Sequence, residues 1–245
     1  MKIQLVVFDI AGTTVRDDDA VNRCLREALA GFVMVSRAEV NRVMGMPKKI
    51  AIRALLESNE TNGSRARQEL VDSIYEDFQA RMLRHYWTAG EVEPMPHAIE
   101  TFGQLKKASL SLVLDTGFSR AITDAILARL GWKDGLMFEA TVTSDEVPRG
   151  RPYPDLIQRA MALTGTADPG RVAKVGDTPA DLLEGTAAGC GLVIGVTNGT
   201  HTREELAAHP HTHLIGDLRE LPAIVLSELP VPTGNPGLAS NVSLA

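Results

Sequence analysis

Four places in the sequence carry polar or charged groups that together suit phosphoryl transfer, and three of them follow a short apolar run. They are Asp9 after residues 5–8, Thr116 with Gly117 after residues 110–114, Arg151 within residues 150–154, and Asp177 after residues 171–175. A carboxylate can act as the nucleophile toward phosphorus, while a metal ion and a cationic side chain neutralise the phosphoryl oxygens. We therefore ask whether one fold brings the four places together.

The pattern after about residue 94 alternates between strands and helices. We expect strands at 3–8, 110–114, 138–142, 171–175, 192–196 and 212–215, and helices at 119–130, 155–163, 180–188 and near 218. Such alternation is typical of an α/β fold with a doubly wound parallel sheet. The carboxyl ends of parallel strands meet at one edge of the sheet, so Asp9, Thr116 and Asp177 are predicted to converge there.

Residues 17–90 contain helical periodicity and no convincing strand. Helices are expected from Asp17 to Gly31 and over 37–44, 48–56 and 65–86. This helical cap would be inserted just after the first strand and lie over the end of that strand. The expected organisation is a core of residues 1–15 and 94–228, a cap of 16–93, and a loose tail of 229–245 rich in Pro, Gly, Ser and Asn.

Composition narrows the class of protein. The 245 residues carry a net charge of −6 and only 4% aromatic residues, which argues against a nucleic-acid surface. Cys24 and Cys190 form neither a zinc spacing nor a disulfide framework, which suits a reducing cytoplasm. No apolar run approaches the roughly 18 residues that span a bilayer. We expect a cytoplasmic enzyme with a small substrate, without nucleic-acid or membrane partners, and leave a homodimer open.

Five motifs in order give the chain a specific resemblance. They are Phe8-Asp9-Ile10-Ala11-Gly12-Thr13-Thr14, Met44-Gly45-Met46-Pro47-Lys48, Thr116-Gly117-Phe118, Gly150-Arg151-Pro152-Tyr153-Pro154 and Lys174-Val175-Gly176-Asp177-Thr178-Pro179-Ala180-Asp181. With these motifs the sequence resembles the haloacid dehalogenase superfamily, and within it the phosphonatase (phosphonoacetaldehyde hydrolase) branch. The match covers nearly the whole chain, and it implies a Rossmann-like core with a helical cap.

The resemblance also implies roles for single residues. Asp9 matches the nucleophile that forms an aspartyl-phosphate, and Mg²⁺ would be held by Asp9, Asp177 and the backbone carbonyl of Ala11. The phosphoryl group would be bound by Thr116, Gly117 and Arg151, where most of the superfamily has lysine. The substrate would also meet Met44 and Gly45 of the cap. Asp181, Gly12 and Thr13 are expected to position these residues without contacting the metal ion or the substrate themselves.

Ala11 distinguishes this chain from most phosphatases that it resembles. Those enzymes carry a second Asp at this position, which protonates the leaving group and later activates water; alanine can do neither. Cleavage of a carbon–phosphorus bond next to an aldehyde does not need that acid. It needs an electron sink, which an amine supplies by condensing with the aldehyde to a protonated imine.

Lys48 is the candidate amine, because the Met-Gly-x-x-Lys spacing of the phosphonatase cap falls on Met44, Gly45 and Lys48. It follows Pro47 at a predicted helix start, where the helix dipole disfavours a cation and lowers the pKa of lysine. The alternative interpretation is an exposed surface lysine. The neighbouring Lys49 does not fit the spacing.

Departures from the phosphonatase pattern leave three hypotheses. The family has a histidine where this chain has Ala51, a tyrosine where it has Phe118, and a cysteine near Asp19. The first hypothesis is a Mg²⁺-dependent hydrolase that cleaves phosphonoacetaldehyde or a related small phosphonate through an aspartyl-phosphate and a Lys48 Schiff base. The second is a phosphatase for a small phosphate monoester, with Lys48 dispensable. The third is a catalytically idle phosphonate-binding module, since Ala11 leaves no obvious base.

Overall fold

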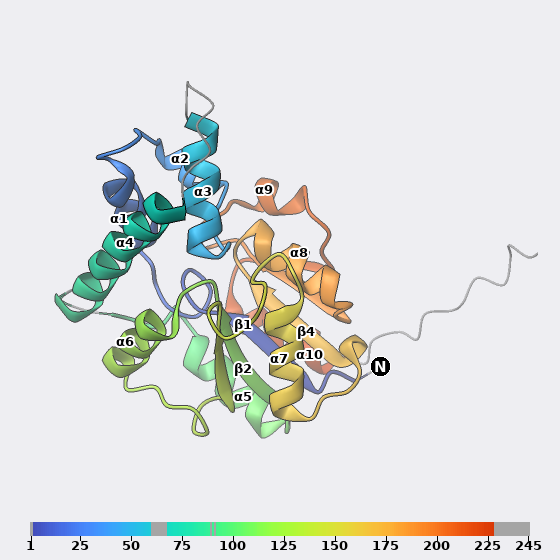
Figure 1. The fold of residues 1–245 in the computed structure, drawn as a ribbon. Helices are drawn as coiled ribbons and strands as arrows, with labels where there is room; N and C mark the ends of the chain where they lie inside the picture. The colour runs from blue at the N-terminus through green and yellow to red at the C-terminus, as the bar shows by residue number, and fades with distance from the viewer. Residues whose placement is uncertain (1, 60–67, 89, 91, 228–245) are drawn as a thin grey trace, which may run out of the picture.

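A computed structural model describes residues 2–59, 68–88, 90 and 92–227 (Figure 1). The strands are β1 (Leu5–Asp9), β2 (Ser111–Thr116), β3 (Ala140–Thr143), β4 (Val172–Gly176), β5 (Leu192–Val196) and β6 (His213–Ile215). The α-helices are α1 (Ala20–Leu29), α2 (Arg37–Asn41), α3 (Lys48–Asn59), α4 (Gln68–Thr88), α5 (Ala98–Lys107), α6 (Arg120–Leu130), α7 (Asp155–Thr164), α8 (Pro179–Ala188), α9 (Arg203–Ala207) and α10 (Leu221–Leu226). Two short 3₁₀ helices, η1 (Pro169–Arg171) and η2 (Leu218–Glu220), complete the described elements.

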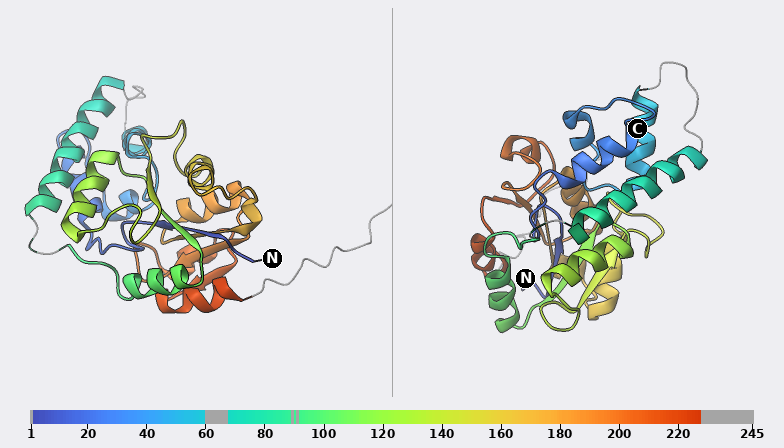
Figure 2. Two further views of the ribbon diagram at one scale, coloured as in Figure 1. Left: turned by 90° about the horizontal axis from the view of Figure 1, so that it is seen from below. Right: turned by 90° about the vertical axis from the view of Figure 1, so that its left-hand side faces the viewer.

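All strands of the described sheet are parallel and run in the order β3-β2-β1-β4-β5-β6. Helices α7 and α8 cover one face, while α5 and α10 lie on the other, as the left view of Figure 2 shows. Because both faces are covered, β1, β4 and β5 are buried along their whole length, which explains their nearly continuous apolar runs. The predicted doubly wound α/β fold is confirmed.

The strand order reverses at β1, which has β2 on one side and β4 on the other. In doubly wound sheets a crevice opens at this reversal, beyond the carboxyl ends of the strands. The last residue of β1, Asp9, lies in this crevice, and it pairs in register with Asp115 of β2. Two carboxylates are therefore neighbours at the same edge of the sheet, and this arrangement requires nearby positive charge.

Helices α1 to α4, hereafter the helical block, are inserted between β1 and α5 and lie beyond the carboxyl edge of the sheet (Figure 1). Helix α4 packs against α1 and α3, and it also contacts α6 of the α/β part. The chain enters and leaves the block through two adjacent segments. The amide of Met95 donates to the carbonyl of Thr14 at 2.8 Å, and that of Arg16 donates to the carbonyl of Glu93 at 3.0 Å.

The observed elements differ from the predicted ones in a few places. The helix expected over 37–44 ends at Asn41, because the chain then turns toward Gly45, which has a positive φ of 81°. The helix expected over 48–56 continues to Asn59. Helices α5 and α9 were not predicted. The start of the helix expected at 65 and the tail 229–245 lie outside the described residues.

Candidate active site

Asp9 lies at the carboxyl end of β1 and is 5% exposed. Its Oδ1 accepts a hydrogen bond of 2.6 Å from Nη1 of Arg151. Burial raises the pKa of Asp9 to about 8, although the guanidinium of Arg151 acts in the opposite direction. Ionising the carboxyl group of Asp9 at this buried position costs free energy unless further positive charge is bound nearby. The site is thus suited to a metal ion.

Arg151 is 1% exposed and contacts several carboxylates at once. Besides Asp9, its Nη2 donates to Oδ1 of Asp115 at 2.5 Å and its Nε donates to Oε2 of Glu184 at 3.0 Å. Its Nη1 also lies 3.1 Å from Oδ1 of Asp181. The planar guanidinium presents donors in several fixed directions, so it can serve these partners simultaneously.

Lys174 is a second buried cation in the same cluster. It lies in the middle of β4, and its Nζ is 2.5 Å from Oδ1 of Asp115, 3.0 Å from Oε2 of Glu184 and 3.2 Å from Oδ1 of Asp181. Burial and the nearby Arg151 disfavour its charge, but these carboxylates raise the pKa of Lys174 above its usual value. The two cations and their carboxylate partners form a buried ionic cluster directly behind Asp9.

Asp177 follows β4 and is fixed by two donors. Its Oδ1 accepts from the Thr13 hydroxyl at 2.9 Å, and its Oδ2 accepts from the backbone amide of Thr200 at 2.6 Å. Gly12 approaches so closely that an added Cβ would lie 2.3 Å from Oδ2 of Asp177. Its positive φ of 88° likewise favours glycine. The turn after β1 is therefore shaped around this carboxylate.

The carboxylates at this edge fit a small divalent cation. One oxygen from each of Asp9, Asp177 and Asp181 lies within 4.8 Å of the other two. Mg²⁺ prefers such oxygen ligands. Among the described residues no hydrogen bond reaches Oδ2 of Asp9, whereas Oδ1 of Asp181 already faces Arg151 and Lys174. Asp9 and Asp177 are consequently the better candidate ligands.

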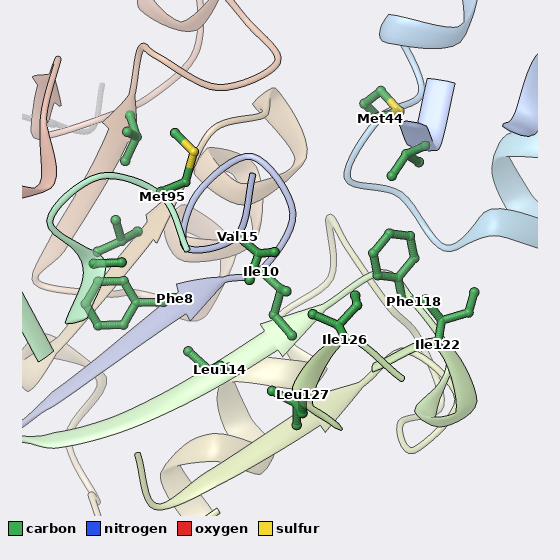
Figure 3. Packing of buried hydrophobic residues seen from close by; sticks show 14 of the residues in the cluster. Phe8, Ile10, Val15, Met44, Met95, Leu114, Phe118, Ile122, Ile126 and Leu127 are labelled. Atoms are coloured by element: carbon green, nitrogen blue, oxygen red, sulfur yellow. The ribbon is translucent and has the colours of Figure 1, made fainter. Parts of the chain in front are cut away.

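A small cavity of about 30 Å³ unites most of the residues singled out in the sequence. Its lining comes from both the α/β part and the helical block: Asp9, Ala11, Val21, Met44, Gly45, Lys48, Thr116, Gly117, Phe118, Arg151, Thr178 and Thr200. The Thr116 hydroxyl accepts from the amide of Phe118 at 3.2 Å, which shapes the turn after β2. In Figure 3, Phe118 lies beside Ile122 and Ile126, between α6 and the segment that carries Met44.

The segment 44–48 of the helical block meets the α/β part at positions where only glycine fits. A Cβ on Gly117 would lie 2.9 Å from the carbonyl oxygen of Gly45 and 3.0 Å from that of Met46. A Cβ on Gly150 would lie 2.4 Å from Cγ of Pro47. Both distances are too short for a side chain, so backbone packs directly on the segment that leads into Lys48.

Lys48 is the first residue of α3 and is 5% exposed, so it is not a solvated surface lysine. Its Nζ is 3.4 Å from the carbonyl oxygen of Met46 and 5.4 Å from the centroid of the Phe118 ring. Burial lowers the pKa of Lys48 to about 8, against the opposing effect of Asp9. The lowered pKa agrees with our expectation, but burial is its main cause. Lys49, by contrast, is exposed and pairs with Asp72 at 2.6 Å.

Sequence reasoning missed several members of the site. Asp115, Lys174 and Glu184 hold Arg151 in place or neutralise its surroundings, and the amide of Thr200 fixes Asp177. For Asp115 and Lys174 the sequence did contain an indication of this role. Charged residues inside strands that are covered on both faces are almost always paired. Thr200 lies in a loop after β5, and no motif marks it.

Comparisons with known proteins agree with this geometry. A family model described as haloacid dehalogenase-like hydrolase matches residues 3–189. A phosphonoacetaldehyde hydrolase from Bordetella pertussis is 33% identical over 198 residues, covering 77% of this chain and 71% of that protein. One from Bacteroides fragilis is 31% identical over 235 residues, covering 90% and 87%.

A solved structure resembles the fold over most of its length. The phosphonoacetaldehyde hydrolase like protein from Oleispira antarctica superposes with a TM-score of 0.77 at 20% identity, covering 92% of each chain. In addition, none of the helices in the described ranges has the length and apolar character that a membrane crossing requires.

Proposed function

Because the chain belongs to the haloacid dehalogenase-like hydrolases, we propose that it cleaves the carbon–phosphorus bond of phosphonoacetaldehyde or a related small phosphonate, with Mg²⁺ as cofactor. The relatives from Bordetella pertussis and Bacteroides fragilis, both named phosphonoacetaldehyde hydrolase, support this substrate class. The observation that carries the proposal is that the amine of Lys48 lines the same small cavity as Asp9 and Ala11.

The Lys48 amine begins the proposed reaction. Its lowered pKa leaves a useful fraction neutral near pH 8, and the neutral amine condenses with the substrate aldehyde, releasing water and forming a protonated imine. The imine then withdraws electron density from the carbon attached to phosphorus. No acid at position 11 is needed for this leaving group, which accounts for Ala11.

Asp9 carries out the phosphoryl step. Its carboxylate attacks phosphorus, and the electron pair of the broken carbon–phosphorus bond moves into the imine to give an enamine on Lys48. Protonation at carbon and hydrolysis then release acetaldehyde from phosphonoacetaldehyde and regenerate the amine. Water hydrolyses the aspartyl-phosphate to inorganic phosphate and Asp9.

The remaining residues bind and orient the phosphoryl group. Arg151 already directs Nη1 to Asp9, and Thr116 and Gly117 lie at the end of the neighbouring strand. Asp9 and Asp177 would hold Mg²⁺ together with the carbonyl of Ala11. When bound, the ion neutralises phosphoryl oxygens and offsets the repulsion between Asp9 and the anionic substrate.

Borohydride trapping tests the proposal. Reduction during turnover of phosphonoacetaldehyde is expected to inactivate the enzyme and to add mass on the peptide that contains Lys48. Lys48→Ala should abolish the adduct and lower kcat by at least about 100-fold. Lys49→Ala, in the exposed neighbour, is the matched control and should behave like the wild type. Undiminished turnover by Lys48→Ala, with no adduct in the wild type, would overturn the Schiff base.

A phosphatase acting on a small phosphate monoester is the second candidate. It is supported by Ala51, which is buried beside Lys48 in α3 and offers no proton-handling group where the phosphonatase pattern has one. This function predicts Mg²⁺-dependent phosphate release from monoesters that survives Lys48→Ala. A screen of phosphorylated metabolites in which no ester is hydrolysed would exclude it.

A further inference from the structure

A second, much larger cavity lies outside the proposed catalytic cavity, where the helical block meets α8 and α9. Its volume is about 740 Å³, within the roughly 300–1,000 Å³ of small-molecule sites. Residues 37–46 of the helical block form one wall, and residues of α8, α9 and the loops beside them form the other. Asp9, Lys48 and Arg151 do not line it, but Met44 lines both cavities, so the two are neighbours.

The lining combines apolar side chains with cationic ones. Met46, Ala180 and Leu183 belong to the apolar part of the wall, and Arg37 and Arg42 lie at its helical-block side. Arg37 is paired with Asp19 at 2.8 Å. Arg42 is exposed, and its charge acts on Glu39 of α2, but none of the salt bridges among the described residues includes it.

The acidic residue in the lining, Glu205, interacts electrostatically with His201 and also caps a helix. Glu205 accepts a hydrogen bond of 2.8 Å from the amide of Thr202, as part of the cap of α9. Its carboxylate is therefore directed to the start of its own helix. The guanidinium of Arg42 thus stays available to a ligand.

His201 adds a polar group to the same wall. Its side chain is 6% exposed and lines the cavity, yet its buried Nδ1 has no hydrogen-bond partner in the described part of the chain. Buried polar atoms normally have a partner, because an unmade hydrogen bond costs about 1–3 kcal/mol. An oxygen of a ligand in the cavity is a candidate partner for this ring.

From the size, the apolar wall, the unpaired arginine and the unsatisfied histidine, we propose that this cavity binds a small organic anion with an apolar body. The anionic group would lie at Arg42, within reach of His201, and the apolar body would lie against Met46 and Leu183. The inference rests on the cavity alone and does not depend on the proposed reaction. Binding and catalysis can therefore be tested separately.

Fluorescence titration of the full chain with two related probes tests the proposal. The first probe is 8-anilinonaphthalene-1-sulfonate, an aromatic anion, and the second is N-phenyl-1-naphthylamine, which has the same rings without the sulfonate. We expect one sulfonate probe per chain and at least about tenfold weaker binding of the uncharged probe. Equal affinity for the two probes would overturn the assignment of an anion site.

Paired surface variants locate the probe. Arg42→Glu should weaken binding of the sulfonate probe by about tenfold or more, whereas Arg159→Glu, at an exposed position of α7, should change it by less than about twofold. Leu183→Asp should weaken binding likewise, and Leu163→Asp, which is exposed on α7, should not. Thermal melting of each variant confirms that it is folded. Unchanged binding by Arg42→Glu and Leu183→Asp would overturn the site.

Discussion

One carboxylate oxygen, Oδ1 of Asp115, accepts hydrogen bonds of 2.5 Å from both Arg151 and Lys174. Asp115 is fully buried in β2, in register with Asp9 of β1. It therefore links the residue proposed to bind the phosphoryl group to a second cation that never reaches the substrate cavity. The side chain of Arg151 is therefore held in position by protein contacts that do not require a bound ligand.

Replacing Asp115 tests this arrangement. Asp115→Asn leaves Lys174 and Arg151 buried with one carboxylate fewer, and we expect the free energy of unfolding to fall by about 3 kcal/mol. Urea denaturation measures the change. The control is Asp134→Asn at an exposed position, which should stay within about 0.5 kcal/mol of the wild type. A loss no greater than that of the control would show that the cluster is not held together through Asp115.

Arg151 is expected not to tolerate lysine, although most of the superfamily carries lysine there. A single ammonium cannot contact Asp9, Asp115 and Glu184 in the directions that the guanidinium uses. Arg151→Lys should lower kcat/KM for phosphate release by about 100-fold. Arg149→Lys, at an exposed residue nearby, is the matched control and should leave kcat/KM unchanged. Wild-type kinetics of Arg151→Lys would contradict this role.

The buried Lys48 predicts a pH dependence of stability. Its pKa is about 8 in the folded state and 10.5 when unfolded, so between these values the unfolded chain binds more protons. The contribution of Lys48 to the free energy of unfolding therefore increases as the pH rises from 8 toward 10.5. The cost of burying the charged amine, on the order of 3 kcal/mol, is fully present below pH 8.

Comparison with Lys48→Met isolates this contribution. At pH 7 the variant should be more stable than the wild type in urea denaturation. The advantage should shrink by pH 10, because the folded-state amine is then neutral and the pH approaches the unfolded pKa of 10.5, so little free energy of protonation is left to lose on folding. Groups that do not interact with Lys48 titrate alike in both proteins and cancel. Asp9, whose charge acts on Lys48, is removed from the comparison by making both proteins in an Asp9→Asn background. A difference that stays constant between pH 7 and 10 would mean that Lys48 has an ordinary pKa.

Gly117 should be essential for activity because of what lies against it. An added methyl group would meet the carbonyl oxygens of Gly45 and Met46 at about 3 Å and push segment 44–48 away from the sheet. We expect Gly117→Ala to lower kcat/KM by at least about tenfold through misplacement of Lys48. Gly103→Ala, in α5 with nothing near its Cβ, should keep full activity and gain up to about 1 kcal/mol of stability. Equal activity of the two variants would refute this account.

The convergence of strand ends could be predicted because it depends only on parallel strands. Asp9, Thr116, Gly117 and Arg151 line one cavity, and Asp177 lies beside Asp9 in the carboxylate cluster, as the alternation of strands and helices indicated. The burial of Lys48 could not be predicted from its own surroundings in sequence. It results from the contact of Lys48 with Phe118 and from the packing of residues 45–47 on Gly117 and Gly150, which the tertiary fold brings together.

The buried ionic cluster could be predicted from the sequence only in part. The position of Lys174 inside a buried strand indicates that it is paired, but its partners Asp115 and Glu184 are identified only when β4 and α8 are placed beside β2. Helix α9 was missed although Thr202 and Glu205 form a capping box at its start, a pattern that is readable in sequence. Short helices of this kind lack enough turns for their periodicity to be evident.

The contact of Gly117 and Gly150 with residues 45–47 also bears on how this architecture can change over time. Because this particular contact is formed by main-chain atoms and Pro47, it does not depend on side chains elsewhere in the helical block, whereas the packing of α4 on α6 does. Substitutions elsewhere in the block therefore leave this contact of residues 45–47 unchanged. On the proposed function, substrate specificity would change through position 48 and its neighbours, with the residues proposed to bind the phosphoryl group retained.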